Sequence, residues 1–414
     1  MKDINAGWAR NKLKLIIGLI GKANVGKSTF FNAATELAVP AANYPFTTIE
    51  PNVGVAYARV KCVCRELGVQ DNPVHSLCID GNRFIPVKLV DVAGLVPGAH
   101  AGKGLGNKFL DDARQADALI HIVDASGSTD SNGKSVPAGT GDPMFDIQFV
   151  EEEFDLWLAA LVGRDWAKNA REAEGLGQKL EQLLAKRLSG LALTEQHVSA
   201  AIHASGLGMK KPVSWTEDDI LAFCKILRSR AKPFVIAANK ADLPSADANI
   251  AKMKSAGLEV IPCASEAEAL LRKASKKGVL HYLPGDSSFD VKPNVALNAQ
   301  QEKALDIVRT LMQKYGSTGV QEAINIACFK LLHNIAVYPV EDEFKLIDKK
   351  GNILPDVRLL AEGSTAKDLA ETVHADLARG FLYAVDARTK QRIGADHKLK
   401  SGDVIKIVSA TSRG

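Results

Sequence analysis

The sequence predicts an α/β protein with a mainly parallel sheet and ligand sites at the carboxyl ends of its strands. The run Leu13–Ile20 is short, apolar and rich in β-branched residues, and it leads into a glycine-rich loop, as a buried parallel strand does. A helical segment, Ser28–Thr35, follows that loop. Two further apolar runs, Ile85–Val90 and Pro233–Ala238, end directly before polar motifs. Open α/β sheets bind their ligands at such positions.

The glycine-rich loop fits the phosphate-binding pattern G-x-x-x-x-G-K-[ST] between Gly21 and Ser28. Its glycines allow backbone N–H groups to surround the phosphates, which also face the positive end of the following helix. Lys27 would reach the β- and γ-phosphates, and the Ser28 hydroxyl would ligate Mg²⁺. The nucleotide-binding residues expected from this loop are Asn24, Val25, Gly26, Lys27, Ser28 and Thr29.

Two further motifs follow in the order that a guanine-nucleotide site requires. Asp91 and Gly94 belong to Asp-x-x-Gly, in which the carboxylate can hold the metal's water shell and the glycine N–H can sense the γ-phosphate. Asn239, Lys240 and Asp242 form Asn-Lys-x-Asp. The Asp242 carboxylate can accept hydrogen bonds from N1–H and the exocyclic amine of guanine, a pair of donors that adenine lacks. Together the three motifs predict that the chain binds and hydrolyses GTP.

The composition is that of an ordinary soluble globular protein, and 414 residues suffice for two or three domains. No apolar stretch approaches the roughly 18 residues needed to span a bilayer, and the first apolar run ends in a glycine loop instead of a cleavage site. We therefore expect a cytoplasmic protein without a membrane partner. The net charge of +4 is weak for this length. Any RNA contact would come from a local patch, and DNA is not an expected partner.

A long segment between the second and third motifs predicts an insertion. Gly94 and Asn239 are 145 positions apart, although one or two βα units of about 30 residues each would suffice to join them. The intervening leucines recur at helical spacing, and Thr216-x-x-Asp219 resembles a capping box. We therefore expect an inserted helical arm, with its leucine stripe used for helix–helix packing. The expected divisions are 12–144 and 232–285 for the nucleotide-binding domain, 145–231 for the arm, 286–333 for a helical connector and 334–412 for a C-terminal domain.

The last eighty or so residues change character and predict a small α+β module. A helix is expected over Leu369, Val373 and Leu377, begun by a capping box at Thr365 and stopped at Gly380. Strands are expected at Ala336–Val340, Glu343–Ile347, Phe381–Val385 and Val404–Val408. The predicted order is therefore ββαββ.

The six cysteines argue against a disulfide framework in a chain of this kind. Four possible metal ligands occur close together in the sequence: Cys62, Cys64, His75 and Cys78. The C-x-C spacing is tighter than zinc sites prefer. We favour packed or surface thiols in a β-hairpin insertion, and metal binding by these four residues stays an open alternative.

The chain resembles the Obg-related family of translation-factor-class GTPases, in the branch that includes YchF, and more closely its archaeal members with a C-terminal TGS domain. The resemblance runs nearly end to end and is carried by residues 26–29, 43–52, 91–96, 104–107 and 402–404. It implies a Ras-like P-loop G domain, an inserted helical arm of coiled-coil-like character and a β-grasp TGS domain. It also implies that Thr48 closes on Mg²⁺ and the γ-phosphate of GTP, and that the ribosome or RNA is a partner.

Two departures from the family pattern bear on the function. Many YchF relatives lack Asn-Lys-x-Asp and prefer ATP, whereas this sequence keeps the motif, so the ATP preference is not carried over. The base-supporting loop usually reads Ser-Ala and here reads Ala264-Ser265. We favour a GTP-dependent switch, alternating between GTP and GDP, that acts on ribosomes or RNA. The alternative is a YchF-like ATPase or nucleotide-gated binding module in stress regulation.

The residue that activates the attacking water is not the usual one. Ras-type enzymes place Gln after Asp-x-x-Gly, but Leu95 occupies this position and can neither donate nor accept a hydrogen bond. Unaided hydrolysis should be slow, on the order of 10⁻⁴ to 10⁻² per second. Asn24 could instead hold K⁺ over the phosphates, as in some related GTPases, and His100 could swing towards the γ-phosphate. The expected catalytic residues are Lys27, Thr48, Gly94 and His100, and the expected metal ligands are Ser28, Thr48 and Asp91.

Overall fold

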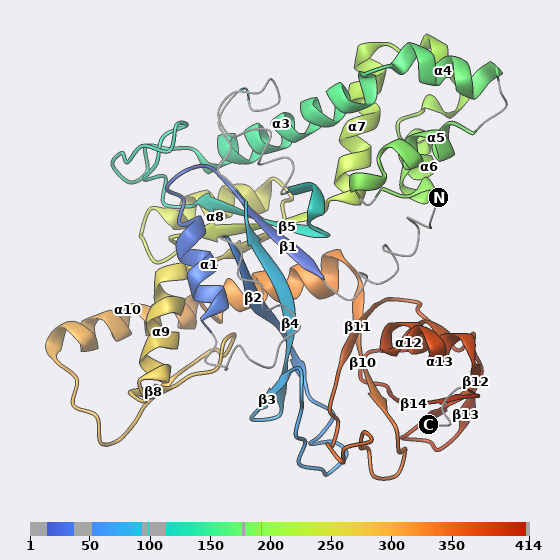
Figure 1. The fold of residues 1–414 in the computed structure, drawn as a ribbon. Coiled ribbons are helices and arrows are strands. Elements are labelled where there is room, and N and C mark those ends of the chain that lie inside the picture. The colour runs from blue at the N-terminus through green and yellow to red at the C-terminus, as the bar shows by residue number, and fades with distance from the viewer. Residues whose placement is uncertain are drawn as a thin grey trace.

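The computed structural model describes residues 15–36, 52–92, 98, 113–175, 179–191 and 193–410. Its centre is a seven-stranded sheet in the order β2-β4-β1-β5-β6-β7, with β3 paired to β4 (Figure 1). Strands β1, β4, β5, β6 and β7 run parallel, while β2 and β3 run antiparallel to β4. The bounds are β1 Ile16–Ile20, β2 Val53–Lys61, β3 Leu77–Ile79, β4 Asn82–Asp91, β5 Ala118–Asp124, β6 Phe234–Asn239 and β7 Val260–Pro262. The predicted α/β class and its three motif-bearing strands are confirmed.

The register of the sheet brings the polar motifs to one edge. Leu19 in β1 lies opposite Asp91 in β4, and Asp124 in β5 lies opposite Asn239 in β6. Because parallel strands end at the same edge, the phosphate loop after β1 meets the ends of β4, β5 and β6 there.

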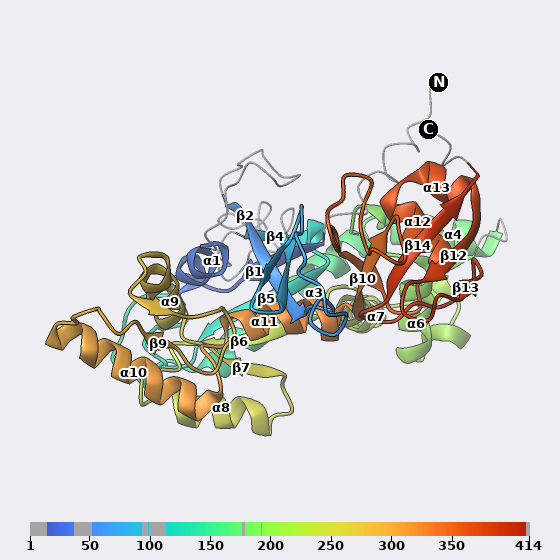
Figure 2. The same ribbon diagram turned by 90° about the horizontal axis from the view of Figure 1, so that it is seen from below.

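Helices cover both faces of the sheet. On one face, α1 (Lys27–Thr35) and α11 (Val320–Asn325) pack against β1 and β5, as Figure 2 shows for α11 below the strands. On the other face, Val150 and Phe154 pack against Ile20 and Leu119. The remaining elements here are α8 (Ala246–Ser255), α9 (Ser265–Lys276), β8 (Leu280–His281), β9 (Asp290–Val291), α10 (Ala299–Tyr315) and a π-helical segment after α11, Ile326–Leu331.

A helical arm is inserted between β5 and β6. It consists of α3 (Pro143–Gly163), α4 (Trp166–Gly175), α5 (Leu180–Arg187), α6 (Glu195–Ala204) and α7 (Glu217–Ala231). The leucine stripe is buried in the arm's own core, where Leu184 and Leu188 join a stacked pair of Trp166 and Trp215. Thr216 caps α7 by accepting from the backbone N–H of residue 219, as the sequence predicts. No helix in the described part of the chain combines the length and apolar character that crossing a bilayer requires.

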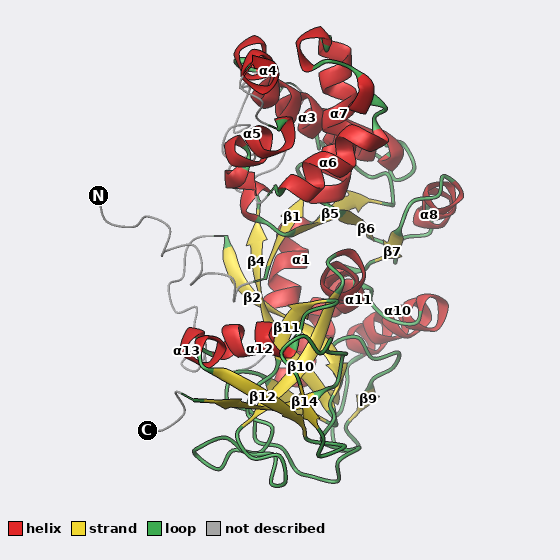
Figure 3. Cartoon of the chain, turned by 90° about the vertical axis from the view of Figure 1, so that its right-hand side faces the viewer, coloured by secondary structure: helices red, strands yellow, loops and turns green. Residues whose placement is uncertain are grey.

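The C-terminal module has a five-stranded sheet in the order β11-β10-β14-β12-β13. Its central pair, β10 and β14, is parallel, and helix α12 packs on the sheet. In Figure 3 this module lies below the main sheet and the arm lies above it. The bounds are β10 Asn334–Val340, β11 Arg358–Ala361, α12 Ala366–Val373, α13 Ala375–Arg379, β12 Phe381–Asp386, β13 Arg392–Ile393 and β14 Val404–Ser409.

Two details of the predicted ββαββ order are wrong. The segment Glu343–Ile347 forms a turn, because the Asp342 carboxylate accepts from the backbone N–H groups of residues 344 and 345 at 2.8 Å and Leu346 has a φ of +59°. The predicted helix is broken at His374, whose extended backbone separates α12 from α13. The observed order is ββααβββ, with β11 supplying the second strand.

Candidate nucleotide-binding site

The phosphate loop turns sharply between β1 and α1. Gly26 precedes the helix with a φ of +94°, and a Cβ there would lie 2.2 Å from Nδ2 of Asn239, so only glycine fits. Asn24 also has a positive φ, +62°, a region that Asn adopts more readily than most residues. The loop therefore leads into the first turn of α1, whose unpaired N–H groups form the usual cradle for an anion.

Lys27, Ser28 and Asp91 lie together where α1 begins and β4 ends. The Lys27 ammonium is 2.6 Å from Oδ1 of Asp91, and the Ser28 hydroxyl donates to Oδ2 of the same carboxylate at 3.2 Å. A hydroxyl and a carboxylate are the oxygen ligands that Mg²⁺ takes beside phosphates and water. The donor set therefore fits the metal that the sequence predicts, and Lys27 is a cation that a phosphate could draw away from Asp91.

Asn239 connects the Asn-Lys-x-Asp motif, here called the base motif, to the phosphate loop. Its amide nitrogen donates to the Val25 carbonyl at 2.9 Å, and its Oδ1 accepts from the Ser265 backbone N–H at 3.0 Å and hydroxyl at 2.8 Å. Ala264 and Ser265 are both buried, so in this Ala-Ser order the serine bonds to Asn239 inside the protein. Asp242 is exposed and bonds to no other described residue, so its carboxylate is available to a ligand.

Asp124, at the end of β5, organises the loop that follows it. Its carboxylate accepts from the hydroxyls of Ser126 at 2.5 Å and Ser128 at 2.8 Å, and it pairs with the Lys240 ammonium at 2.9 Å. Burial alone would raise the pKa of Asp124, but these hydrogen bonds and Lys240 together lower it. The carboxylate is therefore ionised and fixes Lys240 of the base motif. Sequence reasoning missed this role, although an acidic residue at the end of an apolar strand was a usable signal.

A buried lysine ties the phosphate loop to the same segment. Lys22 donates to the backbone carbonyl of Asp130 at 2.7 Å and pairs with the Asp146 carboxylate in α3 at 2.7 Å. Burial raises the pKa of Asp146 to about 6, and Lys22 opposes that rise. Asn24 adds a bond from its side-chain nitrogen to the Gly133 carbonyl at 2.8 Å. The glycine-rich segment after β5 is thus held against the phosphate loop at several points.

The structure brings most of the predicted site residues together. Those from the phosphate loop, from Asn-Lys-x-Asp and from Ala264-Ser265 surround one edge of the sheet, together with Asp91. Thr48, Gly94, Leu95 and His100 lie outside the described residues.

Family models match the chain in three parts. Residues 16–144 match the model of a 50S ribosome-binding GTPase, and residues 237–342 match the G4 motif-containing domain of the YGR210-like Obg-like GTPases. Residues 349–409 match the TGS domain.

Relatives resemble the chain over nearly its whole length. The GTP-binding protein MJ1332 of Methanocaldococcus jannaschii is 50% identical over 397 residues, 95% of this chain and 99% of the relative. The ribosome-binding ATPase YchF of Bacillus subtilis is 27% identical over 386 residues, 90% of this chain and 88% of the relative. The crystal structure of a GTP-binding protein from Pyrococcus horikoshii OT3 covers 96% of this chain and is itself covered completely (100%), with 43% identity and a TM-score of 0.77.

Proposed function

The chain belongs to the Obg-like, YchF-related family of GTP-binding proteins with a C-terminal TGS domain, and we propose that its site is a guanine-selective GTPase centre that works as a switch. The observation that carries the proposal is the double link made by Asn239, which joins the base motif to the phosphate loop and to the loop of Ser265. A base read by Asp242 thereby becomes coupled to the phosphates bound after β1.

In this proposal each site residue has one task. Lys27 leaves Asp91 for the β- and γ-phosphates, and the N–H groups at the start of α1 bind phosphate oxygens. Ser28 and Asp91 hold Mg²⁺, which P-loop GTPases generally use and which neutralises charge on the phosphates when bound. Thr48 and Gly94 complete the γ-phosphate sensor. Hydrolysis then breaks the bond between the β-bridging oxygen and the γ-phosphorus by attack of water.

Guanine selectivity is the sharpest test, because some relatives are named ATPases. We expect at least a hundredfold preference for GDP over ADP, since adenine leaves the Asp242 carboxylate without its two donors. Titration of the full-length protein with fluorescent GDP and ADP measures this ratio. Equal affinities for the two nucleotides would overturn the proposal and favour the ATPase alternative.

Water activation in the proposal depends on a cation held by Asn24 or on His100. The Asn24 amide nitrogen already bonds the Gly133 carbonyl, so its side-chain oxygen is the group left to bind K⁺. The same hydrogen bond would also fit a purely structural role, in which Asn24 only stabilises the loop. The rate without a partner should be on the order of 10⁻⁴ to 10⁻² per second.

Single-turnover hydrolysis in K⁺ and in Na⁺ separates these roles. Asn24→Asp keeps a side-chain oxygen but loses the donor to Gly133, whereas Asn24→Ala loses both. We expect K⁺ to accelerate the native protein and Asn24→Asp, and not Asn24→Ala. An equal loss in both variants would make Asn24 a loop-stabilising residue. His100→Ala tests the second candidate in the same assay, and an unchanged rate in all variants would require activation by a partner.

The proposed partner is the ribosome, as the name of the Bacillus subtilis relative says of that protein, and the proposed location is the cytoplasm. Residues 334–414 hold 13 basic and 12 acidic side chains, so charge alone does not favour RNA. Large apolar side chains are exposed instead, on the arm at Met209 (99%) and on the TGS domain at Phe344 (72%) and Leu382 (60%). Figure 1 shows arm and TGS domain on the same, right-hand side of the molecule.

Point substitutions test this surface better than deletion of the TGS domain, because β10 shares a hydrophobic core with the main sheet. We expect Met209→Ser and Leu382→Ser to reduce co-sedimentation with ribosomes at least tenfold together, without changing GTP hydrolysis. Ile307→Ser is the matched control, since Ile307 is 50% exposed on α10. Undiminished co-sedimentation of the double variant would remove this surface from the proposal.

A further inference from the structure

Three cysteines and an aspartate lie together at the end of β2 and β4 that is remote from the nucleotide site. One ligand atom from each of Cys62, Cys64, Asp71 and Cys78 lies within 4.8 Å of every other. Cys62 and Cys64 are buried, Cys78 is half-buried, and all three thiols are free. We call these four residues the cysteine cluster.

The fold assembles the cluster because β2 ends before the first cysteine. β2 stops at Lys61, and residues 63–68 form turns. Cys62 and Cys64 therefore lie at and within this turn, and both thiols belong to the cluster. Cys78 comes from β3, which pairs with the start of β4 and returns the chain to the same place.

His75, the fourth ligand considered from the sequence, is not part of the cluster. Its Nδ1 lies 2.8 Å from the Asp356 carboxylate in the C-terminal module, and its side chain is half exposed. Asp71 takes the fourth position instead, with Oδ2 3.1 Å from the Cys62 sulfur.

The spacing of the ligand atoms fits tetrahedral coordination. Four ligands around Zn²⁺ at about 2.3 Å would place two sulfurs about 3.8 Å apart. The sulfurs of Cys64 and Cys78 are 3.7 Å apart. Three soft thiolates with one carboxylate also suit Zn²⁺ better than Mg²⁺ or Ca²⁺, which prefer oxygen ligands.

A buried arginine offsets part of the negative charge of such a centre. Three thiolates and a carboxylate around Zn²⁺ leave about two negative charges in excess. The Arg83 side chain is fully buried, and it donates to the Asp71 carboxylate at 2.7 Å and to the Ser76 hydroxyl at 2.9 Å. Its Nε has no partner among the described residues. Ligating carboxylates are commonly oriented by such outer hydrogen bonds.

We propose that Cys62, Cys64, Cys78 and Asp71 form a structural Zn²⁺ site that fixes the β2–β3 connection where the TGS domain packs on it. This site is independent of the proposed GTPase function, because it shares no residue with the nucleotide site.

The segment held by the cluster makes many of the contacts to the TGS domain. The backbone N–H of Asn72 donates to the Ile353 carbonyl at 3.1 Å, and that of Val74 donates to the Pro355 carbonyl at 2.8 Å. Arg83 donates to the Leu354 carbonyl at 3.0 Å.

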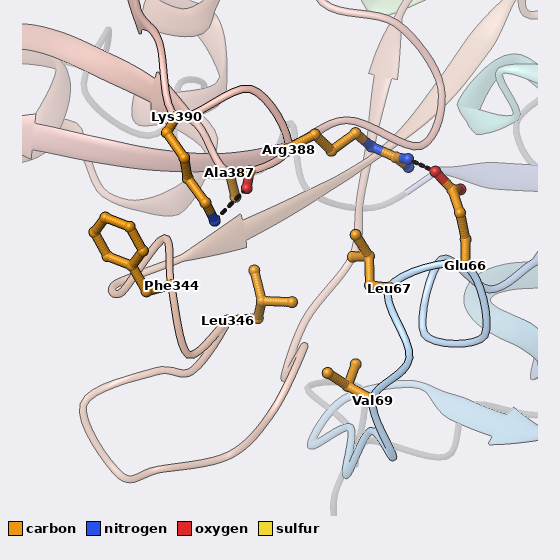
Figure 4. A pocket seen from close by; sticks show the side chains of 8 residues that line it. All are labelled: Glu66, Leu67, Val69, Phe344, Leu346, Ala387, Arg388 and Lys390. Carbon is orange, nitrogen blue, oxygen red and sulfur yellow. Dashed lines mark hydrogen bonds and ion pairs between the residues drawn. The ribbon is translucent and has the colours of Figure 1, made fainter.

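The apolar contacts at this junction are continuous with the cluster. Cys62, Cys64 and Tyr338 belong to one hydrophobic core that extends into the main sheet. Figure 4 shows the adjoining pocket of about 380 Å³, where Leu67 and Val69 face Leu346, and Arg388 reaches Glu66. A metal that fixed the turn after β2 would therefore fix one side of the junction.

Metal analysis of the native protein tests the proposal without any variant. Full-length protein purified without added metal should contain about one Zn²⁺ per chain. After exchange with Co²⁺ it should show the visible absorption of a tetrahedral thiolate complex. Absence of Zn²⁺ together with no Co²⁺ spectrum would overturn the site, as would a Cys64–Cys78 disulfide found by mass spectrometry in the freshly purified protein.

Paired variants identify the ligands. Asp71→Ala and Cys78→Ser should each weaken Zn²⁺ binding more than about tenfold in competition with a chromogenic chelator. His75→Ala and Cys224→Ala should leave it unchanged, since Cys224 is a buried thiol in the arm. An equal effect of His75→Ala and Asp71→Ala would contradict the assignment.

Hydrogen exchange tests the structural role. Removal of Zn²⁺ by a chelator should accelerate exchange of the Asn72 and Val74 amides at least tenfold, while the amides of β6 keep their protection. Unchanged exchange at Asn72 and Val74 would contradict a role in holding the TGS domain.

Discussion

The two ends of β4 show opposite ways of using polar side chains. At its carboxyl end, Asp91 joins Lys27 and the exposed Ser28, which can exchange partners when a ligand arrives. At its amino end, Arg83 is fully buried between Asp71 and the TGS domain. We call the carboxyl end, with Lys27, Ser28 and Asp91, the exchanging end of β4. We call the amino end, with Arg83 and Asp71, the fixed end. One strand therefore connects the proposed nucleotide-binding edge to the buried junction with the TGS domain.

The largest expected effect lies at the fixed end. Arg83→Met should lower the free energy of unfolding by about 3–5 kcal/mol, because it removes the buried guanidinium that pairs with the buried Asp71 carboxylate. Urea denaturation measures the change. Arg388→Met is the control, since Arg388 pairs with the exposed Glu66 at the same junction, and it should cost about 1 kcal/mol or less. Equal losses of unfolding free energy in the two variants would contradict the expected difference between a buried and a surface ion pair.

At the exchanging end, the expected effect is on binding. Asn239→Ala should weaken GDP binding about ten- to hundredfold, since it unpairs the Val25 carbonyl and the Ser265 backbone N–H that shape two loops of the site. Isothermal titration measures the affinity. Asn249→Ala removes a similar bond to the Ala125 carbonyl outside the motif and should leave GDP affinity unchanged. Comparable losses in both variants would show that Asn239 acts only through stability.

The sequence predicted the exchanging end far better than the fixed one, for a physical reason. Phosphate and guanine impose their own geometry, so Lys27, Ser28 and Asp242 recur at fixed spacings that are readable without a structure. Asp124 and Lys22 also hold the site, but their ion pairs with Lys240 and Asp146 join segments that are distant in the sequence, so no local motif contains these pairs. In the TGS domain, local turn chemistry at Asp342 overrode the apolar pattern of the next residues.

The cysteine cluster was hidden for a similar reason. Its C-x-C spacing is tighter than zinc sites prefer, and the turn that follows Lys61 is not indicated by that spacing. Asp71 was not considered, because a carboxylate in a polar connection resembles any solvated residue. Its role follows only from the packing of Arg83 and the TGS domain around it.

A histidine in the sheet between the two ends should make stability depend on pH. His121 in β5 is fully buried, and burial lowers its pKa to about 3 from an ordinary value of 6.5. Below about pH 6.5 His121 therefore binds a proton in the unfolded chain but not in the folded chain. Because this favours the unfolded chain, stability is lost as pH falls below about 6.5. Between pH 7 and pH 5 His121 alone should contribute a loss of about 2 kcal/mol.

His121→Leu should remove that part of the pH dependence, as measured by urea denaturation at both pH values. The exposed His281 is the control, and His281→Leu should leave the native slope. If His121→Leu keeps the full pH dependence of the unfolding free energy, groups other than His121 cause the loss of stability at low pH.

The smallest expected effect is at the rim of the exchanging end. Lys252 pairs with Asp142 at 3.0 Å, but both side chains are more than half exposed, at 56% and 51%. Lys252→Ala should therefore change the free energy of unfolding by less than about 1 kcal/mol. A thermal unfolding comparison suffices. A large loss would mean that the loop after β5 depends on its surface pair as well as on Lys22.

The most direct measurement of the central claim is a change of base specificity. Asp242→Asn replaces an acceptor of two guanine donors by an amide that can donate to the 2-oxo group of xanthine. The kcat/KM for GTP should fall at least a hundredfold and that for XTP should rise above it, with native unfolding stability because Asp242 is exposed. If Asp242→Asn still prefers GTP to XTP, Asp242 does not read the base and the account of this site is wrong.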